Sequence, residues 1–256
     1  MYFPGSLGGW CPVVWRQAPG VTDVALTFDD GPHPETTPAI LDLLRHHDAT
    51  ATFFFSGVRA AASPDLVAQA VAAGHAAYAH GWDHVDHERV GSADSAVACL
   101  QRAELLLSAF RPTPDPYLVR LPFNAGMKRQ RFHRSLRRFR PRARFAWWTI
   151  SAQDWRLAEH CADPAELARR CGAVASTLAG RRDLPGSIVL LHEAPFGATG
   201  PLVPRIAPEL LRAVLAMLRA RGLRAGPLAP PVPRAHERYF WWHPGADRLI
   251  LPPARV

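Results

Sequence analysis

The sequence predicts a single-domain α/β fold whose strands are mostly parallel. Apolar, strand-like runs alternate with helix-like periodic segments along most of the 256 residues, and such repetition is typical of parallel strands joined by right-handed crossovers. A chain of this length can bury one large core, and 48% hydrophobic with 20% charged residues is the composition of a folded protein. The alternation leaves two arrangements open, a closed barrel and an open doubly wound sheet.

Seven short apolar runs have the pattern of buried strands. They lie near residues 24–28, 50–55, 75–79, 117–120, 144–150, 187–191 and 222–225. Helix starts are expected where a capping residue precedes proline, at Thr37-Pro38, Ser63-Pro64 and Asp163-Pro164. Gly74 and Gly222 stand where helices are expected to end.

The chain divides into a lead segment over residues 1–21, the α/β domain over 22–225 and an extension over 226–256. The extension is rich in proline and then in aromatic residues, and it is expected to form a hairpin-like element packed on the domain. No apolar run approaches the roughly 18 to 20 residues of a membrane span. The first 15 residues have no basic region ahead of an apolar core. A cytoplasmic protein is therefore expected, or an exported one if a leader has been removed.

The cysteines show no spacing typical of a metal or redox site. Cys11, Cys99, Cys161 and Cys171 form no CxxC pair, and disulfides are rare in cytosolic proteins. Buried free thiols are therefore expected.

The net charge of +8 could indicate a polyanionic partner. Much of the excess lies in residues 128–144, where Phe132, Leu136 and Phe139 fall on one helix face. We interpret this segment as a surface helix with a solvated arginine face. No nucleic-acid-binding motif accompanies it, so no nucleic-acid partner is expected. A basic module for an anionic polymer is the non-enzymatic alternative, and the oligomeric state cannot be read from the sequence.

Two adjacent carboxylates end the first predicted strand, in the run TFDDGP at residues 27–32. Asp29 and Asp30 could belong to an ordinary turn, but acids at the C-terminal end of a parallel strand also occupy the usual place of α/β active sites. His80 and His84 follow the third strand at the i, i+4 spacing. This spacing would place both imidazoles on one face of a helical turn, facing one metal ion, although it also arises by chance.

Polar clusters follow the next predicted strands as well. Arg120 follows the fourth strand, Asp154 and Trp155 follow the fifth, and His192 ends the sixth. Taken singly, Arg120 could be a surface arginine, Asp154 a helix cap, and His192 a histidine with its hydrogen bonds satisfied at a strand end. Because five clusters follow five of the seven predicted strands, we expect all of them to meet at one rim of the sheet or barrel.

These motifs, in this order, resemble those of the polysaccharide deacetylase family, also called carbohydrate esterase family 4 or NodB-homology enzymes. The resemblance covers residues 22–192 and rests on TFDDGP, HxxxH, RxPF, DW and LxH, with ATFFF at 51–55 and Gly57 as further support. It implies that 22–225 is the catalytic domain. It also implies a distorted (β/α)7-type barrel, which agrees with the independent strand count.

Carried over to this sequence, the resemblance implies that Asp30, His80 and His84 bind a divalent metal. Zinc is expected, with cobalt or a similar ion as the alternative, because two imidazoles and a carboxylate suit a catalytic zinc site. Asp29 would be the general base that takes a proton from the attacking water. Arg120 would hold Asp29 in its charged form, since an opposite charge favours an ionised carboxylate.

The same resemblance assigns the remaining roles. The backbone amide of Phe123 would help to stabilise the oxyanion. His192 would be the general acid that protonates the departing amine, and Asp154 beside it would raise its pKa. Leu190 and Trp155 would form the small apolar pocket for the acetyl methyl group.

Three positions depart from the family pattern. Gly81 replaces the usual Ser or Thr after the first metal histidine, which removes a loop hydrogen bond but no ligand. Asn124 replaces a glycine, and asparagine enters the left-handed region more readily than most residues. Phe123 stands where tyrosine is usual, which is harmless if only the backbone acts.

The expected function is metal-dependent removal of N-acetyl groups from amino sugars in an oligo- or polysaccharide of the chitin-oligomer or peptidoglycan type. The same site could instead deformylate a sugar-lipid or open a cyclic amide. Trp82, Trp155 and the Trp147-Trp148 pair favour a glycan, although Trp147 and Trp148 could equally be strand core.

Overall fold

The structure, a computed structural model, describes residues 10–157, 161 and 163–229. Within these residues the strands are β1 (Val13–Val14), β2 (Val24–Asp29), β3 (Thr52–Phe55), β4 (Ala76–Ala79), β5 (Leu118–Val119), β6 (Arg144–Ala146), β7 (Ile150–Ser151), β8 (Ile188–His192) and β9 (Ala225–Gly226). The helices are α1 (Thr36–His46), α2 (Gly57–Ala62), α3 (Pro64–Ala72), α4 (Ala93–Leu107), α5 (Gln130–Phe139), α6 (Pro164–Ala179) and α7 (Val203–Ala220). Two short 3₁₀ turns, η1 (Pro122–Asn124) and η2 (Asp154–Arg156), follow β5 and β7.

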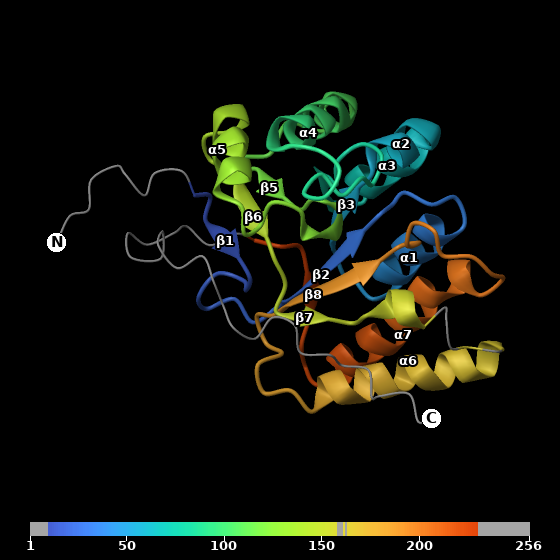
Figure 1. The fold of residues 1–256 in the computed structure, drawn as a ribbon. Helices are drawn as coiled ribbons and strands as arrows, with labels where there is room; N and C mark the ends of the chain where they lie inside the picture. The colour runs from blue at the N-terminus through green and yellow to red at the C-terminus, as the bar shows by residue number, and fades with distance from the viewer. Residues whose placement is uncertain (1–9, 158–160, 162, 230–256) are drawn as a thin grey trace.

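The strands form two hydrogen-bonded sheets. Within each sheet, the ladders between neighbouring strands are parallel. The larger sheet has the order β4-β3-β2-β8-β7 with β9 beside β2, and the smaller has the order β1-β6-β5. Helices α6 and α7 pack together on one side of the central strands, while α4 and α5 pack together on the other (Figure 1). The prediction of a mostly parallel α/β fold is confirmed, with the barrel wall divided into two sheets.

The run at 144–150 is two strands, so its prediction as one strand was wrong. In the small sheet, Phe145 N–H donates to Pro12 O, just before β1, and Trp147 N–H donates to Val14 O of β1. Two residues later, Thr149 N–H donates to Ile188 O in the large sheet. The chain therefore crosses between sheets at this point. Strand β1 was missed because its two residues are too short for an alternating pattern.

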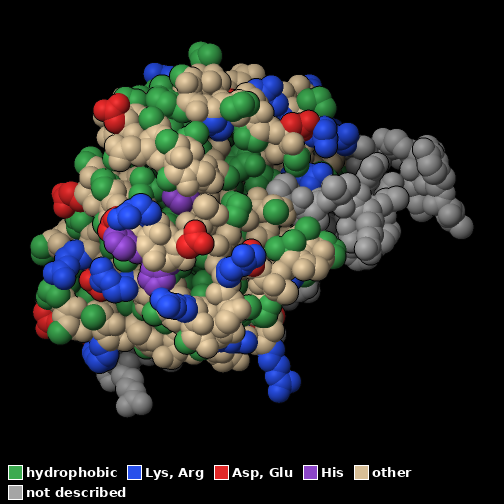
Figure 2. All heavy atoms as spheres, turned by 180° about the vertical axis from the view of Figure 1, so that it is seen from behind, with side chains coloured by type: hydrophobic (Ala, Val, Ile, Leu, Met, Phe, Trp, Pro, Cys, Tyr) green, Lys and Arg blue, Asp and Glu red, His purple; other side chains and the backbone are tan. Residues whose placement is uncertain are grey.

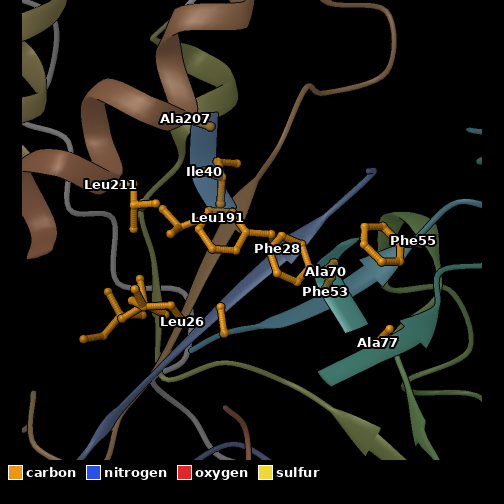
Figure 3. Close-up of a cluster of buried hydrophobic side chains, with 14 of the residues drawn as sticks. Leu26, Phe28, Ile40, Phe53, Phe55, Ala70, Ala77, Leu191, Ala207 and Leu211 are labelled. Atoms are coloured by element: carbon orange, nitrogen blue, oxygen red, sulfur yellow. The ribbon is translucent and has the colours of Figure 1, made fainter. Parts of the chain in front are cut away.

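The central strand β2 separates an apolar face from a polar one. Leu26 and Phe28 point toward the helices, where they meet Leu191, Ile40 of α1 and Leu211 of α7 (Figure 3). Between them, Thr27 and Asp29 face the other way, because successive strand residues alternate sides, and both accept hydrogen bonds from Arg120. The buried apolar face anchors the strand that carries the first carboxylate.

Most of the predicted helix signals hold. Ser63 and Asp163 are N-caps followed by proline, and the Asp163 side chain accepts the Glu166 N–H. Gly74 and Gly222 adopt positive φ just after α3 and α7. Helix α1 begins one residue before Thr37, with Glu35 as its N-cap. The Thr37 hydroxyl is instead bonded to His33 N–H and to the Glu193 carboxylate.

Three further predictions concern the cysteines, a membrane span and the C-terminal extension. All four cysteines are free, with Cys11 and Cys171 buried and Cys99 and Cys161 half-buried. No helix among the described residues is long and apolar enough to cross a membrane. The expected hairpin lies almost entirely in 230–256, outside the described residues.

Candidate active site

A pocket of about 400 Å³ opens at the C-terminal ends of the central strands. Its lining residues come from six separate segments of the chain: Asp29, Asp30, His80, His84, Leu121, Phe123, Asn124, Trp148, Trp155, Leu190, Pro195, Phe196 and His192. The expectation of one shared rim agrees with this geometry, since the parallel register places Asp29 directly beside His192.

Asp30, His80 and His84 converge in this pocket. The Nε2 atoms of His80 and His84 lie 3.4 and 3.1 Å from Asp30 Oδ1. The expected helical turn through the two histidines is wrong, because residues 80–84 form an irregular loop with positive φ at Gly81 and His84. The loop bends sharply enough to bring both rings to the same carboxylate.

The three side chains fit a divalent cation. His80 Nδ1 lies 2.8 Å from the carbonyl oxygen of Arg120, so this nitrogen carries the proton and leaves Nε2 as an acceptor. Asp30 Oδ1 is buried and receives no hydrogen bond, although such atoms are almost always paired. Burial lowers the pKa of His80 and favours the neutral, ligating imidazole. Burial alone would raise the pKa of Asp30, but the surrounding imidazoles hold it well below its usual range.

Asp29 is held by a buried arginine. Arg120 Nη1 donates to Asp29 Oδ1 and to Thr27 Oγ1, both at 2.8 Å, and its other nitrogens donate to the carbonyls of Ala146 and Trp147. Only 2% of Arg120 is exposed, and its guanidinium also lies over the Phe54 ring. The network fixes the orientation of Asp29 within the pocket wall.

His192 is paired with a second buried acid. Its Nδ1 lies 2.9 Å from Asp154 Oδ1, and its backbone N–H donates to Asp154 Oδ2. Burial opposes a charged ring, but Asp154, with smaller contributions from Asp30 and Asp29, raises the pKa of His192 to about 9. Because Nδ1 faces Asp154, Nε2 is the nitrogen left to exchange a proton with the pocket.

The remaining predicted residues also line the pocket. Trp155 meets the His192 ring edge-on at 5.1 Å, and Leu190 is buried beside it. Phe123 and Asn124 have φ values of 55° and 57°, so the left-handed conformation expected for Asn124 is present. Phe123 is 63% exposed, and its ring lies against His84.

The sequence did not point to Arg59, Phe196 or Glu193. Arg59 Nη1 donates to the backbone carbonyls of Asp30 at 2.8 Å and Ala194 at 2.5 Å. Its guanidinium lies 3.7 Å from the centre of the Phe196 ring, and Phe196 stacks on His84. Arg59 therefore supports one candidate ligand through its backbone and another through an aromatic ring.

Glu193 is a buried acid behind the carboxylate loop. Desolvation raises its pKa to about 8, although the Thr37 hydroxyl and Arg59 act in the opposite direction. A Cβ at Gly31 would meet its carboxylate, so the TFDDGP glycine leaves room for this side chain. In the sequence, the only sign of a role for Glu193 was its position directly after His192.

Comparison with known proteins places the chain among deacetylases. The polysaccharide deacetylase family profile matches residues 16–136. A chitooligosaccharide deacetylase of Azorhizobium caulinodans is 30% identical over 222 residues, covering 81% of this chain and 93% of that protein. A peptidoglycan-N-acetylglucosamine deacetylase of Bacillus cereus is 26% identical over 230 residues, covering 85% of this chain and 74% of that protein.

The fold has solved counterparts as well. A crystal structure of a peptidoglycan N-acetylglucosamine deacetylase has a TM-score of 0.66 at 24% identity, and the match covers 89% of this chain and 95% of the other. At this identity the likeness supports the fold, while the sequence relatives support the family. The chain is therefore a member of the polysaccharide deacetylase family.

Proposed function

We propose that this protein is a metal-dependent hydrolase that removes N-acetyl groups from amino sugars in an oligo- or polysaccharide. The observation that carries the proposal is the convergence of two separate carboxylate–partner systems on one pocket. Asp29 with Arg120 lies on one side, and His192 with Asp154 lies on the other. The relatives named as chitooligosaccharide and peptidoglycan deacetylases point to the same substrate class.

Asp30, His80 and His84 would hold the cation, and zinc suits their donor set. When bound, the cation supplies Lewis-acid polarisation of the amide carbonyl and lowers the pKa of the attacking water. Asp29 does not belong to this group of ligand atoms, and Arg120 orients its Oδ1. It is therefore available as the base.

The protein's own groups move two protons. Asp29 accepts a proton from the attacking water as the water oxygen bonds to the carbonyl carbon. Arg120 keeps this carboxylate oriented throughout the step. His192 then gives its Nε2 proton to the amide nitrogen as the C–N bond breaks, which releases acetate and a free amine. Asp154 stabilises the charged ring before the transfer.

The pocket wall selects a small acyl group. Leu190, Trp155 and the buried face of Trp148 form its apolar part, which suits an acetyl methyl group. The backbone amide of Phe123 is proposed to donate to the oxyanion. Loss of one such donor typically costs about 2.7–4 kcal/mol in the transition state.

The test is acetate release from an N-acetylglucosamine tetramer by the purified protein, as isolated, after chelation and after zinc is restored. We expect release that disappears on chelation and returns with zinc. Absence of acetate from a zinc-loaded protein would contradict the substrate class, and an N-formyl sugar and a cyclic amide tested alongside would then identify the alternative. Release that persists after complete removal of metal would contradict the metal-dependent mechanism.

A further inference from the structure

A second group of metal-binding side chains lies outside the catalytic pocket. In the part of the chain that the structure describes, two groups of His, Cys and acidic side chains bring three ligand atoms within 4.8 Å of one another. The first is the catalytic group, and the second consists of Asp83, His87 and Cys99. None of these three residues lines the pocket that holds Asp30. The mechanism proposed above uses none of them.

His87 is oriented as a metal-binding histidine would be. Only 5% of the residue is exposed, and its Nδ1 lies 3.0 Å from Ser95 Oγ. The Ser95 hydroxyl donates its single proton to the Ser92 carbonyl oxygen, so it accepts from Nδ1 and leaves the lone pair on Nε2. A hydrogen bond from the other ring nitrogen is the usual support of a ligating imidazole. A Cβ at Gly91 would lie 2.7 Å from His87 Nδ1, so glycine leaves room for this contact.

Cys99 and Asp83 complete a donor set that suits zinc. Cys99 is a free, half-buried cysteine on α4, and burial raises the pKa of its thiol. The thiol therefore keeps its proton until a metal ion displaces it. Asp83 is exposed, and its charge acts on both His87 and Cys99. A thiolate, an imidazole and a carboxylate favour zinc over magnesium or calcium, which prefer oxygen ligands alone.

The surface as a whole does not attract cations. The chain has a net charge of +8, and on the face shown in Figure 2 the Asp and Glu side chains are scattered among Lys and Arg side chains. A cation is therefore expected only where donor atoms are gathered in one place. The group of Asp83, His87 and Cys99 meets this condition, with one side chain buried and one half-buried.

We propose that Asp83, His87 and Cys99 bind a second zinc ion, separate from the catalytic one. Its fourth ligand would be a water molecule, because Asp83 opens the group to solvent. The inference goes beyond the proposed deacetylase function and does not depend on it.

The position of the group indicates what the second ion does. Asp83 directly precedes the catalytic ligand His84, and Cys99 lies on α4. The start of the same loop is already held at α2, where Val58 N–H and the Ser56 hydroxyl donate to the Trp82 carbonyl oxygen at 2.8 and 3.0 Å. A second ion would fix the following part of the loop to α4, and it would thereby help to position His84.

Cobalt(II) distinguishes the two sites by their ligands. A thiolate bound to cobalt gives an intense charge-transfer band in the near ultraviolet, whereas imidazole and carboxylate ligands do not. Cys99 is the only sulfur ligand in the two groups. The experiment titrates the metal-free full chain with cobalt and records this band. Zinc content per chain is then measured after dialysis against zinc and removal of the unbound metal.

We expect the wild-type protein to show the band and to lose it when zinc is added. Cys99→Ser should abolish the band and bind one zinc ion fewer than the wild type, and His87→Gln should do the same. Cys161→Ser removes the other half-buried cysteine and should leave the band and the zinc content unchanged. Asp30→Asn, at the catalytic group, should keep the band. Circular dichroism of each variant checks that it is folded.

A wild-type protein that binds cobalt without the band would overturn the inference. So would a band that survives in Cys99→Ser, or one that Cys161→Ser abolishes equally. If neither Cys99→Ser nor His87→Gln folds, the band in the wild type and in Asp30→Asn still decides. Acetate release plays no part in this test, so failure of the second site and failure of the deacetylase function are separate results.

Discussion

At the scale of residues, the site depends on two neighbouring acids that reach the same pocket. Side chains of consecutive strand residues normally point to opposite faces. Asp29 ends β2, and Asp30 has a φ of 73°, so the backbone turns and both acids line the pocket. Their surroundings then differ: Asp29 meets an arginine, and Asp30 meets two imidazoles. One dipeptide thus provides two chemically distinct carboxylates.

Asp154→Asn should narrow the pH range of activity from the alkaline side. The pKa of His192 is raised from 6.5 to about 9. Its ion pair with Asp154 therefore stabilises the fold fully below about pH 6.5, and this stabilisation is lost as the pH rises through 9. A cation at Asp30 would bring the pKa down, because it cancels one of the nearby negative charges. Removal of the Asp154 charge lowers the pKa further, and the alkaline limb of the kcat profile should move to lower pH. An unchanged limb would contradict the role of His192 as the acid.

Arg59→Ala should weaken zinc binding, although Arg59 is not a ligand. Its guanidinium holds the carbonyl of Asp30 and the Phe196 ring that stacks on His84. Loss of a group that orients metal ligands typically costs about 10- to 100-fold in metal affinity. Competition with a chromogenic chelator would measure it, with the exposed Arg212→Ala as the control. Equal zinc affinity in both variants would show that Arg59 does not position the site.

At the scale of elements, β2, β4, β7 and β8 of the large sheet have polar residues at or just after their C-terminal ends, while buried apolar residues anchor the sheet. Helix α4 provides a clear test of this anchoring because it has a buried and an exposed leucine. Leu100 is fully buried and Leu105 is 77% exposed. Leu100→Ala should lower the free energy of unfolding by about 2–5 kcal/mol, and Leu105→Ala should change it by less than about 0.5 kcal/mol. Urea denaturation measures both, and equal effects would contradict the packing described.

The sequence predicted the positions of the long strands better than the segments that connect strands. Long apolar runs such as β2 and β8 were found because burial on both sides makes them continuous. The crossing at Trp147–Thr149 was missed, because local apolarity does not reveal which sheet a strand joins. The irregular loop at 80–84 was missed for a related reason: the i, i+4 spacing is helical, but positive φ at Gly81 and His84 overrides it. Arg59 was not found, since its contacts are to backbone atoms distant in the sequence.

At the scale of the whole molecule, a buried histidine joins the start of the described chain to the basic helix. His133 Nδ1 accepts the Cys11 N–H at 3.0 Å, and its Nε2 donates to the Met127 carbonyl at 2.9 Å. Burial lowers the pKa of His133 to about 4, so the neutral ring is required in the fold. Protonation would replace the acceptor at Nδ1 by a second donor that faces the Cys11 N–H.

The protein should therefore lose stability as the pH falls from about 6.5 toward 4. In this range an unfolded His133 binds a proton and the folded one does not, so the free energy of unfolding decreases. His75, also with a pKa lowered to about 4 by burial, adds to the effect. Urea denaturation between pH 7 and 5 measures the slope. His133→Gln should reduce it and the exposed His46→Gln should not; identical slopes for the three proteins would contradict this account.

The central claim is that one pocket separates metal binding from proton transfer, with Asp30 in the first role and Asp29 in the second. The most direct test is Asp29→Asn, assayed for bound zinc and for acetate release from an N-acetylglucosamine tetramer. We predict zinc content equal to that of the wild type and a loss of kcat of about 10²- to 10⁴-fold, the usual contribution of a general base. Loss of zinc together with activity would show that Asp29 is needed for metal binding, and full activity would show that it is not the base. Either result would contradict the assignment.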